Sequence, residues 1–90
     1  MPDRTLELDP IPDDTLESLW DRLPKVAEAI EEVLDWIEAD PPDPRAKRRR
    51  FTNGMWAVTT IVGYEEWLII WDEPEPNLAV IRHIGESASL

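Results

Sequence analysis

The sequence predicts an α+β domain in which two helices pack on one face of a small antiparallel β-sheet. Apolar residues recur with helical spacing between residues 14 and 39, and a proline-rich stretch then ends that pattern. Beyond it, short β-branched and aromatic runs alternate with turn signals. The expected order is β-α-α-β-β-β-β, in which the first of the later strands is short and basic. The 90 residues form one domain, with a loose tail at 85–90.

Two sequence patterns predict the N-terminal elements: alternation of polar and apolar residues for a strand, and a capping pair for a helix. Residues Thr5–Asp9 alternate polar and apolar side chains, which predicts a first strand that Pro10 and Pro12 end. Asp14 lies three residues before Glu17, and this pair is typical of a helix start. One apolar stripe then follows at helical spacing: Leu16, Leu19, Trp20 and Leu23.

The second helix begins at Pro24, which a first helical turn tolerates, and runs to about Ala39. Its apolar stripe consists of Val26, Ile30, Val33, Leu34 and Ile37. The opposite face is acidic and carries Glu28, Glu31, Glu32, Asp35 and Glu38. Trp36 lies off the apolar stripe, so we expect it to be half exposed. Residues 40–44 form a stiff connector.

The later strands are separated by turn residues. Asn53-Gly54 favours a type I′ hairpin turn, and a strand follows at residues 55–62. A turn at 63–66 leads to a strand at 67–71, which is apolar on both faces as expected for a central strand. A polar turn at 72–77 precedes a last strand at 78–84.

Composition excludes several kinds of chemistry. The chain has no cysteine, so disulfides, thiol catalysis and zinc–thiolate sites are excluded. We see no apolar leader at the start and no apolar run near the ~20 residues of a membrane helix. A cytoplasmic protein without a membrane contact is the default expectation. No residue spacing indicates a metal site or a cofactor.

The charge is segregated along the chain. Residues 1–44 carry a net charge of −11, residues 45–64 a net charge of +5, and residues 65–90 a net charge of −5. Overall acidity disfavours general nucleic-acid binding, which needs a broad basic surface. The basic run Lys47–Arg50 balances the acidic helices of its own fold or docks an acidic partner segment.

At the level of whole segments, the chain resembles the RelE/ParE superfamily of bacterial toxins from type II toxin–antitoxin systems. The likeness rests on "RTLELDP", on a helical pair joined at "LP" and closed by "IEADPPDP", on "RRRFTNGMWAV", and on "YEEWLIIWDE" with "LAVIRHIG". The resemblance implies a small antiparallel sheet with two helices against one face. It also implies a cognate antitoxin that masks the toxin, and an action on messenger RNA or on DNA gyrase.

The sequence departs from the ribonuclease members of that superfamily. Those members place Lys and Arg on the strands, an Arg after the terminal Ile-Gly, and often a nearby Tyr. Here the strand positions carry Ala57 and Thr59, then Glu66 and Trp67. Glu86 follows Ile84-Gly85, and the only tyrosine is Tyr64. Whether the chain is an enzyme stays open, and the replaced positions favour binding over catalysis.

Few residues remain as catalytic candidates. Arg82 and His83 adjoin on the last strand, but strand alternation places them on opposite faces. The carboxylate pairs Glu65-Glu66 and Asp72-Glu73 lie in expected turns, where solvated acids are common.

Five tryptophans in 90 residues are the most informative feature. Trp67 and Trp71 share one face of the central strand, and that face either packs in the core or meets a partner. The predicted partner-binding residues are Arg48, Arg50, Trp56, Trp67 and Trp71.

Three functions are consistent with the sequence. The first is a RelE/ParE-like toxin or toxin-derived domain that binds an antitoxin or another protein. The second is a ribosome-dependent or free ribonuclease that uses Arg82, His83 and the basic run. The third is a stand-alone acidic interaction or inhibitor protein that uses the acidic face of the second helix. A homodimer is also compatible with a tryptophan-rich face.

Overall fold

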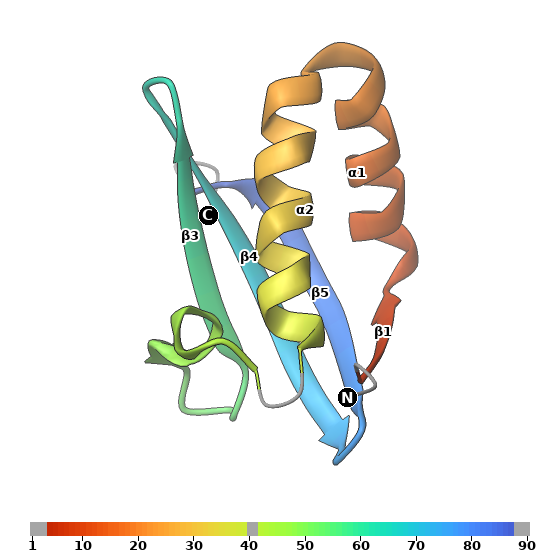
Figure 1. Ribbon diagram of the computed structural model, residues 1–90, viewed down its shortest axis with the longest axis vertical. Helices are drawn as coiled ribbons and strands as arrows, with labels where there is room; N and C mark the ends of the chain where they lie inside the picture. The colour runs from red at the N-terminus through yellow and green to blue at the C-terminus, as the bar shows by residue number, and fades with distance from the viewer. Residues whose placement is uncertain (1–3, 40–41, 88–90) are drawn as a thin grey trace.

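The computed structural model in Figure 1 has two helices lying across one face of a five-stranded sheet. It describes residues 4–39 and 42–87. The elements are β1 (Thr5–Leu8), α1 (Pro10–Arg22), α2 (Pro24–Glu38), the 3-10 helix η1 (Pro44–Lys47), β2 (Arg49–Arg50), β3 (Trp56–Val62), β4 (Glu65–Glu75) and β5 (Leu78–Glu86). The predicted α+β class, the pair of helices and the order of elements are confirmed.

The sheet is mixed, and the expectation of a fully antiparallel sheet is wrong at one edge. The strand order is β1-β5-β4-β3-β2, and the pairs from β2 to β5 are antiparallel. β1 is parallel to β5, with Thr5 opposite Leu78 and Leu8 opposite Ile81. The helical pair returns the chain to the end of the sheet where β1 begins, as Figure 1 shows. Strands β3, β4 and β5 then alternate in direction, so β5 runs the same way as β1.

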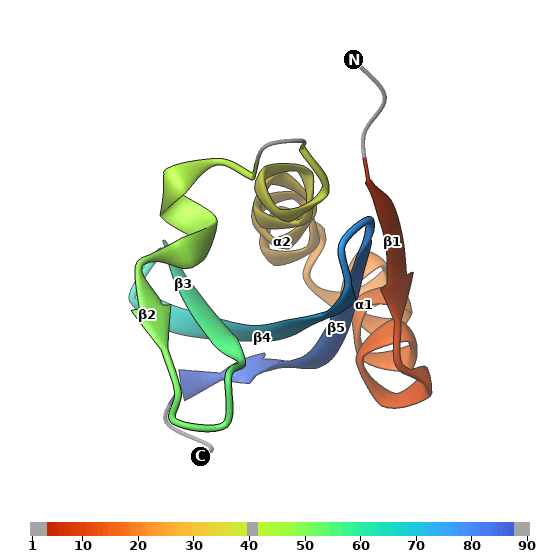
Figure 2. The ribbon, with the colours of Figure 1, turned by 90° about the horizontal axis from the view of Figure 1, so that it is seen from below.

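The core lies between the helices and the sheet, and Figure 2 shows both layers from below. The apolar stripe predicted for α2 is confirmed, because every member of it is buried. The largest fully buried side chains come from both layers: Trp71, Leu19, Ile30, Ile37, Ile69, Ile81, Val33 and Pro12. This burial of apolar surface is the main source of stability for a domain of this size.

The first helix begins earlier than the capping pattern predicts. It starts at Pro10, directly after Asp9, because proline fits the first helical position, where no N–H donor is needed. Leu16 and Leu19 of its predicted stripe are buried, but Trp20 is 45% exposed. The boundary between the helices at Leu23 and Pro24 is as predicted.

The hairpin at Asn53-Gly54 is not the predicted type I′ turn. That turn needs a positive φ at both central residues. Among the described residues only glycines have a positive φ, and Gly54 has a φ of 91°. The N–H of Gly54 donates to the Phe51 carbonyl and the N–H of Phe51 donates to the Met55 carbonyl, which closes a longer loop.

The two central strands are longer than predicted. β4 continues through the expected polar turn to Glu75, because the chain reverses only at Pro76-Asn77. Pro74 is accommodated where the pairing of β4 with β5 is irregular. β5 continues past Ile84 to Glu86. Of the predicted loose tail, residues 88–90 lie outside the described residues, as do residues 40–41 of the predicted connector.

Of the two alternatives for the tryptophan face of β4, packing in the core is the one observed, so the predicted partner-binding role of Trp67 and Trp71 does not hold. Trp67 is 5% exposed and Trp71 is fully buried, because the face that carries them is the one covered by the helices. The opposite face of β4 carries Leu68 and Ile70. Neither Trp67 nor Trp71 is therefore available on the surface to a partner.

We predict that Trp71→Phe lowers the free energy of unfolding by about 2 kcal/mol or more, because a buried carbonyl loses its hydrogen-bond donor. The Trp71 Nε1 donates to the Ala46 carbonyl at 2.9 Å. Unfolding in urea measures the change. Trp20→Phe is the matched control on an exposed ring, and we expect a change within about 0.5 kcal/mol. Equal effects of the two substitutions would contradict the prediction.

Candidate functional site

Most of the positive charge gathers at one corner of the sheet. Residues 45–50 hold five of the nine Lys and Arg residues of the chain and no acidic residue. They form η1 and β2, which lie beside β3 at one edge of the sheet in Figure 2. We call Arg48, Arg49 and Arg50 the basic corner. All three are exposed.

The corner is held by contacts to the core. Ala46 is fully buried, and its carbonyl accepts the hydrogen bond from Trp71. The Lys47 ammonium lies 3.3 Å from Glu73, which also pairs with the buried Arg4. Arg4 in turn donates to the Ile37 carbonyl at the end of α2. These contacts place η1, and hence the start of β2, at a fixed position on the sheet.

Arg45 is held by an ion pair and by an aromatic ring. Its guanidinium donates to both carboxylate oxygens of Asp43, at 3.0 and 2.9 Å, and lies 4.0 Å from the centre of the Trp36 ring. The side-chain and backbone hydrogen bonds from Arg45 lower the pKa of Asp43 to about 2. The same hydrogen bond raises the pKa of Arg45. Trp36 is half-buried, as predicted from its place off the apolar stripe.

Trp56 is the one predicted binding tryptophan that reaches the surface. It is half-buried and stacks on Trp71, with 6.2 Å between the ring centres. Arg50 lies 4.7 Å from the centre of the Trp56 ring, and Lys47 lies 5.2 Å from it. Cation–π contact therefore already engages Arg50 within the molecule.

Arg48 and Arg49 are the cations of the corner that have no close carboxylate partner among the described residues, although the charge of Arg48 also helps to lower the pKa of Asp43. Neither forms an ion pair with another residue in the described ranges 4–39 and 42–87. They line a small cavity of about 150 Å³ between α2, η1 and β3. Its walls are Trp36, Arg45, Arg48, Arg49, Ala57, Val58 and Thr59. We call this cavity the basic pocket. It is suited to an anionic group that places its negative charge beside the guanidinium groups.

Sequence reasoning found this corner but missed part of it. Strand alternation pairs Arg48 with Arg50, but Arg48 has a helical backbone and β2 has only two residues. Arg48 and Arg49 consequently both line the basic pocket. The half-exposed Trp36 was a usable signal for the second wall of the pocket. Nothing in the sequence pattern placed Thr59 there.

The two catalytic candidates do not meet the basic corner. They lie on β5, while Arg49 and Arg50 form β2, and strands β4 and β3 separate them by roughly 14 Å. The Arg82 guanidinium contacts Asp72 at 3.1 Å and Asp9 at 3.2 Å, and these carboxylates raise its pKa. A register shift between β4 and β5 leaves Arg82 between the paired residues Ile81 and His83, so simple alternation does not assign its face.

The predicted acidic pairs have different surroundings. Glu65 and Glu66 are exposed, whereas Asp72 and Glu73 are engaged by cations of the fold. On the acidic face of α2, Glu28, Glu32 and Asp35 are exposed, while Glu31 and Glu38 are half-buried.

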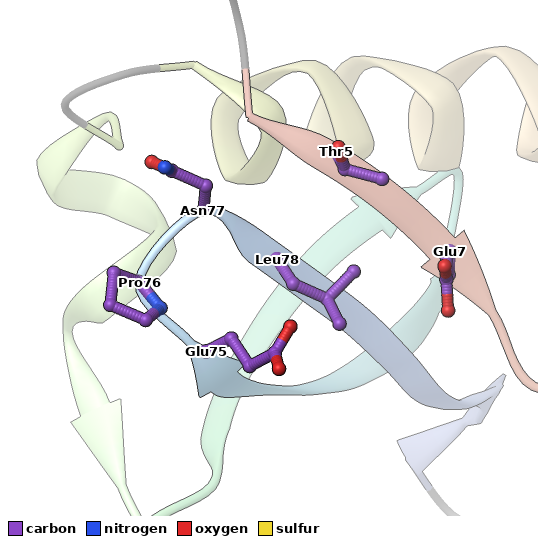
Figure 3. Close-up of a pocket in the computed structure, with 6 residues that line it drawn as sticks. All are labelled: Thr5, Glu7, Glu75, Pro76, Asn77 and Leu78. Carbon is purple, nitrogen blue, oxygen red and sulfur yellow. The ribbon is translucent and has the colours of Figure 1, made fainter.

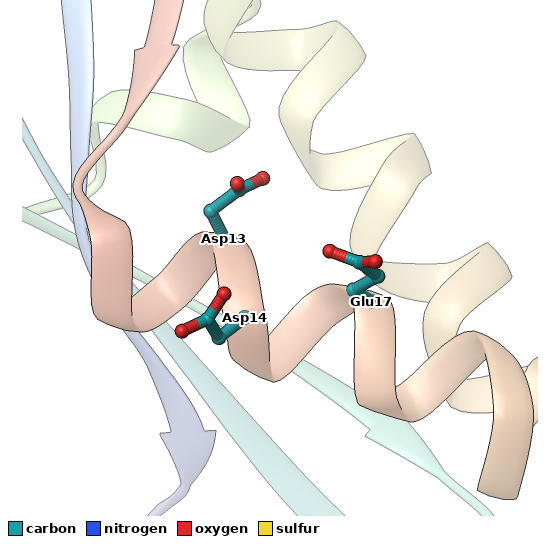
Figure 4. A group of neighbouring side chains, drawn as sticks. All are labelled: Asp13, Asp14 and Glu17. Atoms are coloured by element: carbon teal, nitrogen blue, oxygen red, sulfur yellow. The ribbon is translucent and has the colours of Figure 1, made fainter.

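An acidic cluster and an open depression elsewhere on the surface do not make a site. Asp13, Asp14 and Glu17 lie together on the exposed side of α1, as Figure 4 shows. Exposed carboxylates of this kind are common without a cation, and no second feature points to one. An open depression of about 470 Å³ lies beside β1 and the β4–β5 turn, as Figure 3 shows. Its walls are Thr5, Glu7, Glu75, Pro76, Asn77 and Leu78, which include no cation.

Comparison of this chain with protein-family models, with curated proteins and with solved structures found no match. Within the described residues, neither helix is long and apolar enough to cross a membrane.

We predict that the Asp43 carboxylate titrates with a midpoint near pH 2, followed by the NMR shift of its carboxyl carbon. The folded pKa lies below the ordinary value of 3.8. The stabilisation from the ion pair is therefore present above about pH 4 and is lost as the pH falls from about 4 to about 2. Arg45→Gln should move the midpoint back toward 3.8. A midpoint unchanged by Arg45→Gln would contradict the assignment.

Proposed function

We propose that this chain is a RelE/ParE-like toxin or toxin-derived domain that acts by binding an acidic segment of another protein, such as a cognate antitoxin. The observation that carries the proposal is the pair Arg48 and Arg49, which are exposed and form no ion pair with any other residue that the structure describes, beside a pocket with an aromatic wall. The proposal includes a cytoplasmic location, where such a toxin meets its antitoxin.

The electrostatics favour a local acidic ligand. The chain as a whole has a net charge of −11, so a polyanion with an extended footprint is repelled by most of the surface. A short acidic segment of a protein needs only the corner itself. Arg side chains bind carboxylates through two parallel hydrogen bonds, which gives such a contact direction as well as energy.

The ribonuclease alternative has less support. Arg82 is engaged by Asp9 and Asp72, and these carboxylates would repel a phosphate at this position. The positions of Ala57 and Thr59 supply neither a cation nor a general base. The third alternative, a basic partner on the acidic face of α2, has no unpaired buried side-chain group in its favour among the described residues.

The binding prediction uses two labelled probes of equal length: a twelve-residue peptide rich in glutamate and a twelve-nucleotide single-stranded RNA. Fluorescence anisotropy should detect the peptide on the wild type. Arg48→Ser/Arg49→Ser should weaken its binding at least about tenfold, since each lost charge-assisted hydrogen bond costs about 1.5–3 kcal/mol.

The control is Thr15→Glu/Asn77→Asp, which changes the net charge by the same amount away from the corner. We expect its peptide affinity to stay within about twofold of the wild type, because distant exposed charges are screened. RNA that binds more tightly than the peptide, or equal losses in both variants, would contradict the proposal.

The toxin part of the proposal is tested by induced expression in a bacterial host. We expect growth arrest with intact messenger RNA, relieved by Arg48→Ser/Arg49→Ser and retained by Arg82→Ala/His83→Ala. Arrest with cleaved messenger RNA that is lost only in the Arg82/His83 variant would favour the ribonuclease. Folding of each variant is checked by its unfolding transition in urea.

A further inference from the structure

Among residues 4–39 and 42–87, no strand pairs with the outer edge of β3 over most of its length. β2 pairs only with Trp56 and Ala57. On this side the stretch from Val58 to Val62 has no strand beside it, and it forms the margin of the sheet in Figure 1. On its other side, β3 is paired with β4 along its whole length.

The free hydrogen-bonding groups of this edge can be assigned from the register. Phe51 donates to Met55 at the base of the β2–β3 hairpin, and hydrogen-bonded pairs recur every second residue of an antiparallel ladder. Ala57 therefore directs its N–H and C=O groups toward β2. Two and four residues later, Thr59 and Ile61 direct theirs toward the same side, where no described residue contributes a partner strand.

The residues of this edge offer little protection against pairing. Residues 58–62 read Val-Thr-Thr-Ile-Val, without a charge or a proline, and Ile61 is 69% exposed. The other edge strand, β1, is only four residues long and carries Glu7. Short length and charge are the features that protect sheet edges, so β3 is the edge that favours an added strand.

Two pockets lie at the ends of this free edge. The basic pocket lies at Val58 and Thr59. At the other end a second cavity, of about 470 Å³, has an apolar wall formed by Leu23, Pro24, Val26, Val62 and Gly63, with Arg22, Lys25 and Glu65 at its margin. We call it the apolar pocket. Val58 and Val62 are four residues apart on β3, so their side chains point to the same face of the sheet, the one that faces the helices. They lie roughly 13 Å apart.

We propose that the acidic partner segment binds as a sixth strand antiparallel to β3. Its acidic side chain enters the basic pocket, and an apolar side chain four residues earlier in the segment enters the apolar pocket. The inference rests on the proposed function and names the shape and side-chain spacing of its ligand. Antiparallel pairing continues the pattern of β2 to β5 and gives the more stable ladder.

The test uses a labelled decapeptide with the sequence GSLVTVETSG. In the proposed register its leucine lies opposite Val62, its central threonine opposite Thr60, and its glutamate opposite Val58. The three residues after the glutamate leave the sheet, because Arg49 already pairs with Ala57. Its two valines then lie opposite Ile61 and Thr59 and exchange the backbone hydrogen bonds. We expect fluorescence anisotropy to detect binding to the full chain.

Three matched peptides test the register. N-methylation of both valines removes the donors that face β3, and we expect a loss of at least about tenfold. N-methylation of the central threonine, whose amide points away from β3, should cost much less. The peptide GSEVTVLTSG has the same composition with glutamate and leucine exchanged, and it should bind at least about tenfold more weakly than the first peptide.

Variants of the protein test the two pockets. Leu23→Ser, at a side chain 41% exposed, should weaken binding of the leucine peptide and leave the glutamate-rich peptide unaffected. Equal binding of all four decapeptides, with sensitivity to Arg48→Ser/Arg49→Ser retained, would overturn strand addition and leave the proposed function standing. Failure of both the decapeptides and the glutamate-rich peptide to bind would overturn both.

Discussion

The hydrogen bond from Trp71 to the Ala46 carbonyl is the contact on which the position of the basic corner depends. Trp71 is fully buried at the centre of the sheet, so its indole has a fixed position. Ala46 belongs to η1, a single short turn that has no core of its own. One buried donor therefore connects the centre of the sheet to the segment that carries the cations. Trp56 stacks on the same indole, and Arg50 lies against Trp56. This row of contacts connects the buried Trp71 to the exposed Arg50.

The corner keeps a net positive charge because the ion pairs of the fold engage only some of its cations. Lys47 and Arg45 are neutralised by Glu73 and Asp43, and these pairs hold η1 in place. Arg48 and Arg49 receive no such partner from the described residues. A chain with twenty acidic residues could supply one easily, so their unpaired state is a local arrangement rather than a shortage of carboxylates. Exposed pairs contribute little to stability, which means that leaving two arginines unpaired costs the fold little.

The hydrophobic periodicity of the sequence predicted the helices and strands well. It did not predict how they are arranged relative to one another. The stripe from Val26 to Ile37 determined α2, because a helix with one apolar face has only one way to bury it. The direction of β1 relative to β5 depends on where the helical pair returns the chain, and no local pattern encodes that. The tryptophans of β4 illustrate the same limit. Alternation placed Trp67 and Trp71 on one face, as observed, but only the packing of α1 and α2 decides which face is covered. The basic corner could be predicted from the run of positive charges in the sequence. Its pocket could not, because one wall is Trp36, which comes from a helix distant in the sequence.

The short length of β2 connects the corner to the edge of the sheet. A longer β2 would pair with all of β3 and close the edge. Instead η1 takes the chain away from the sheet at Arg48, and the pairing stops at Ala57. The same departure opens the basic pocket and exposes the backbone of Thr59 and Ile61. A sheet edge that no described strand covers, as at Val58–Val62, invites self-association in a neutral protein. In this chain the net charge of −11 opposes contact between copies, so the edge can remain open for a ligand whose charge is concentrated in one short segment.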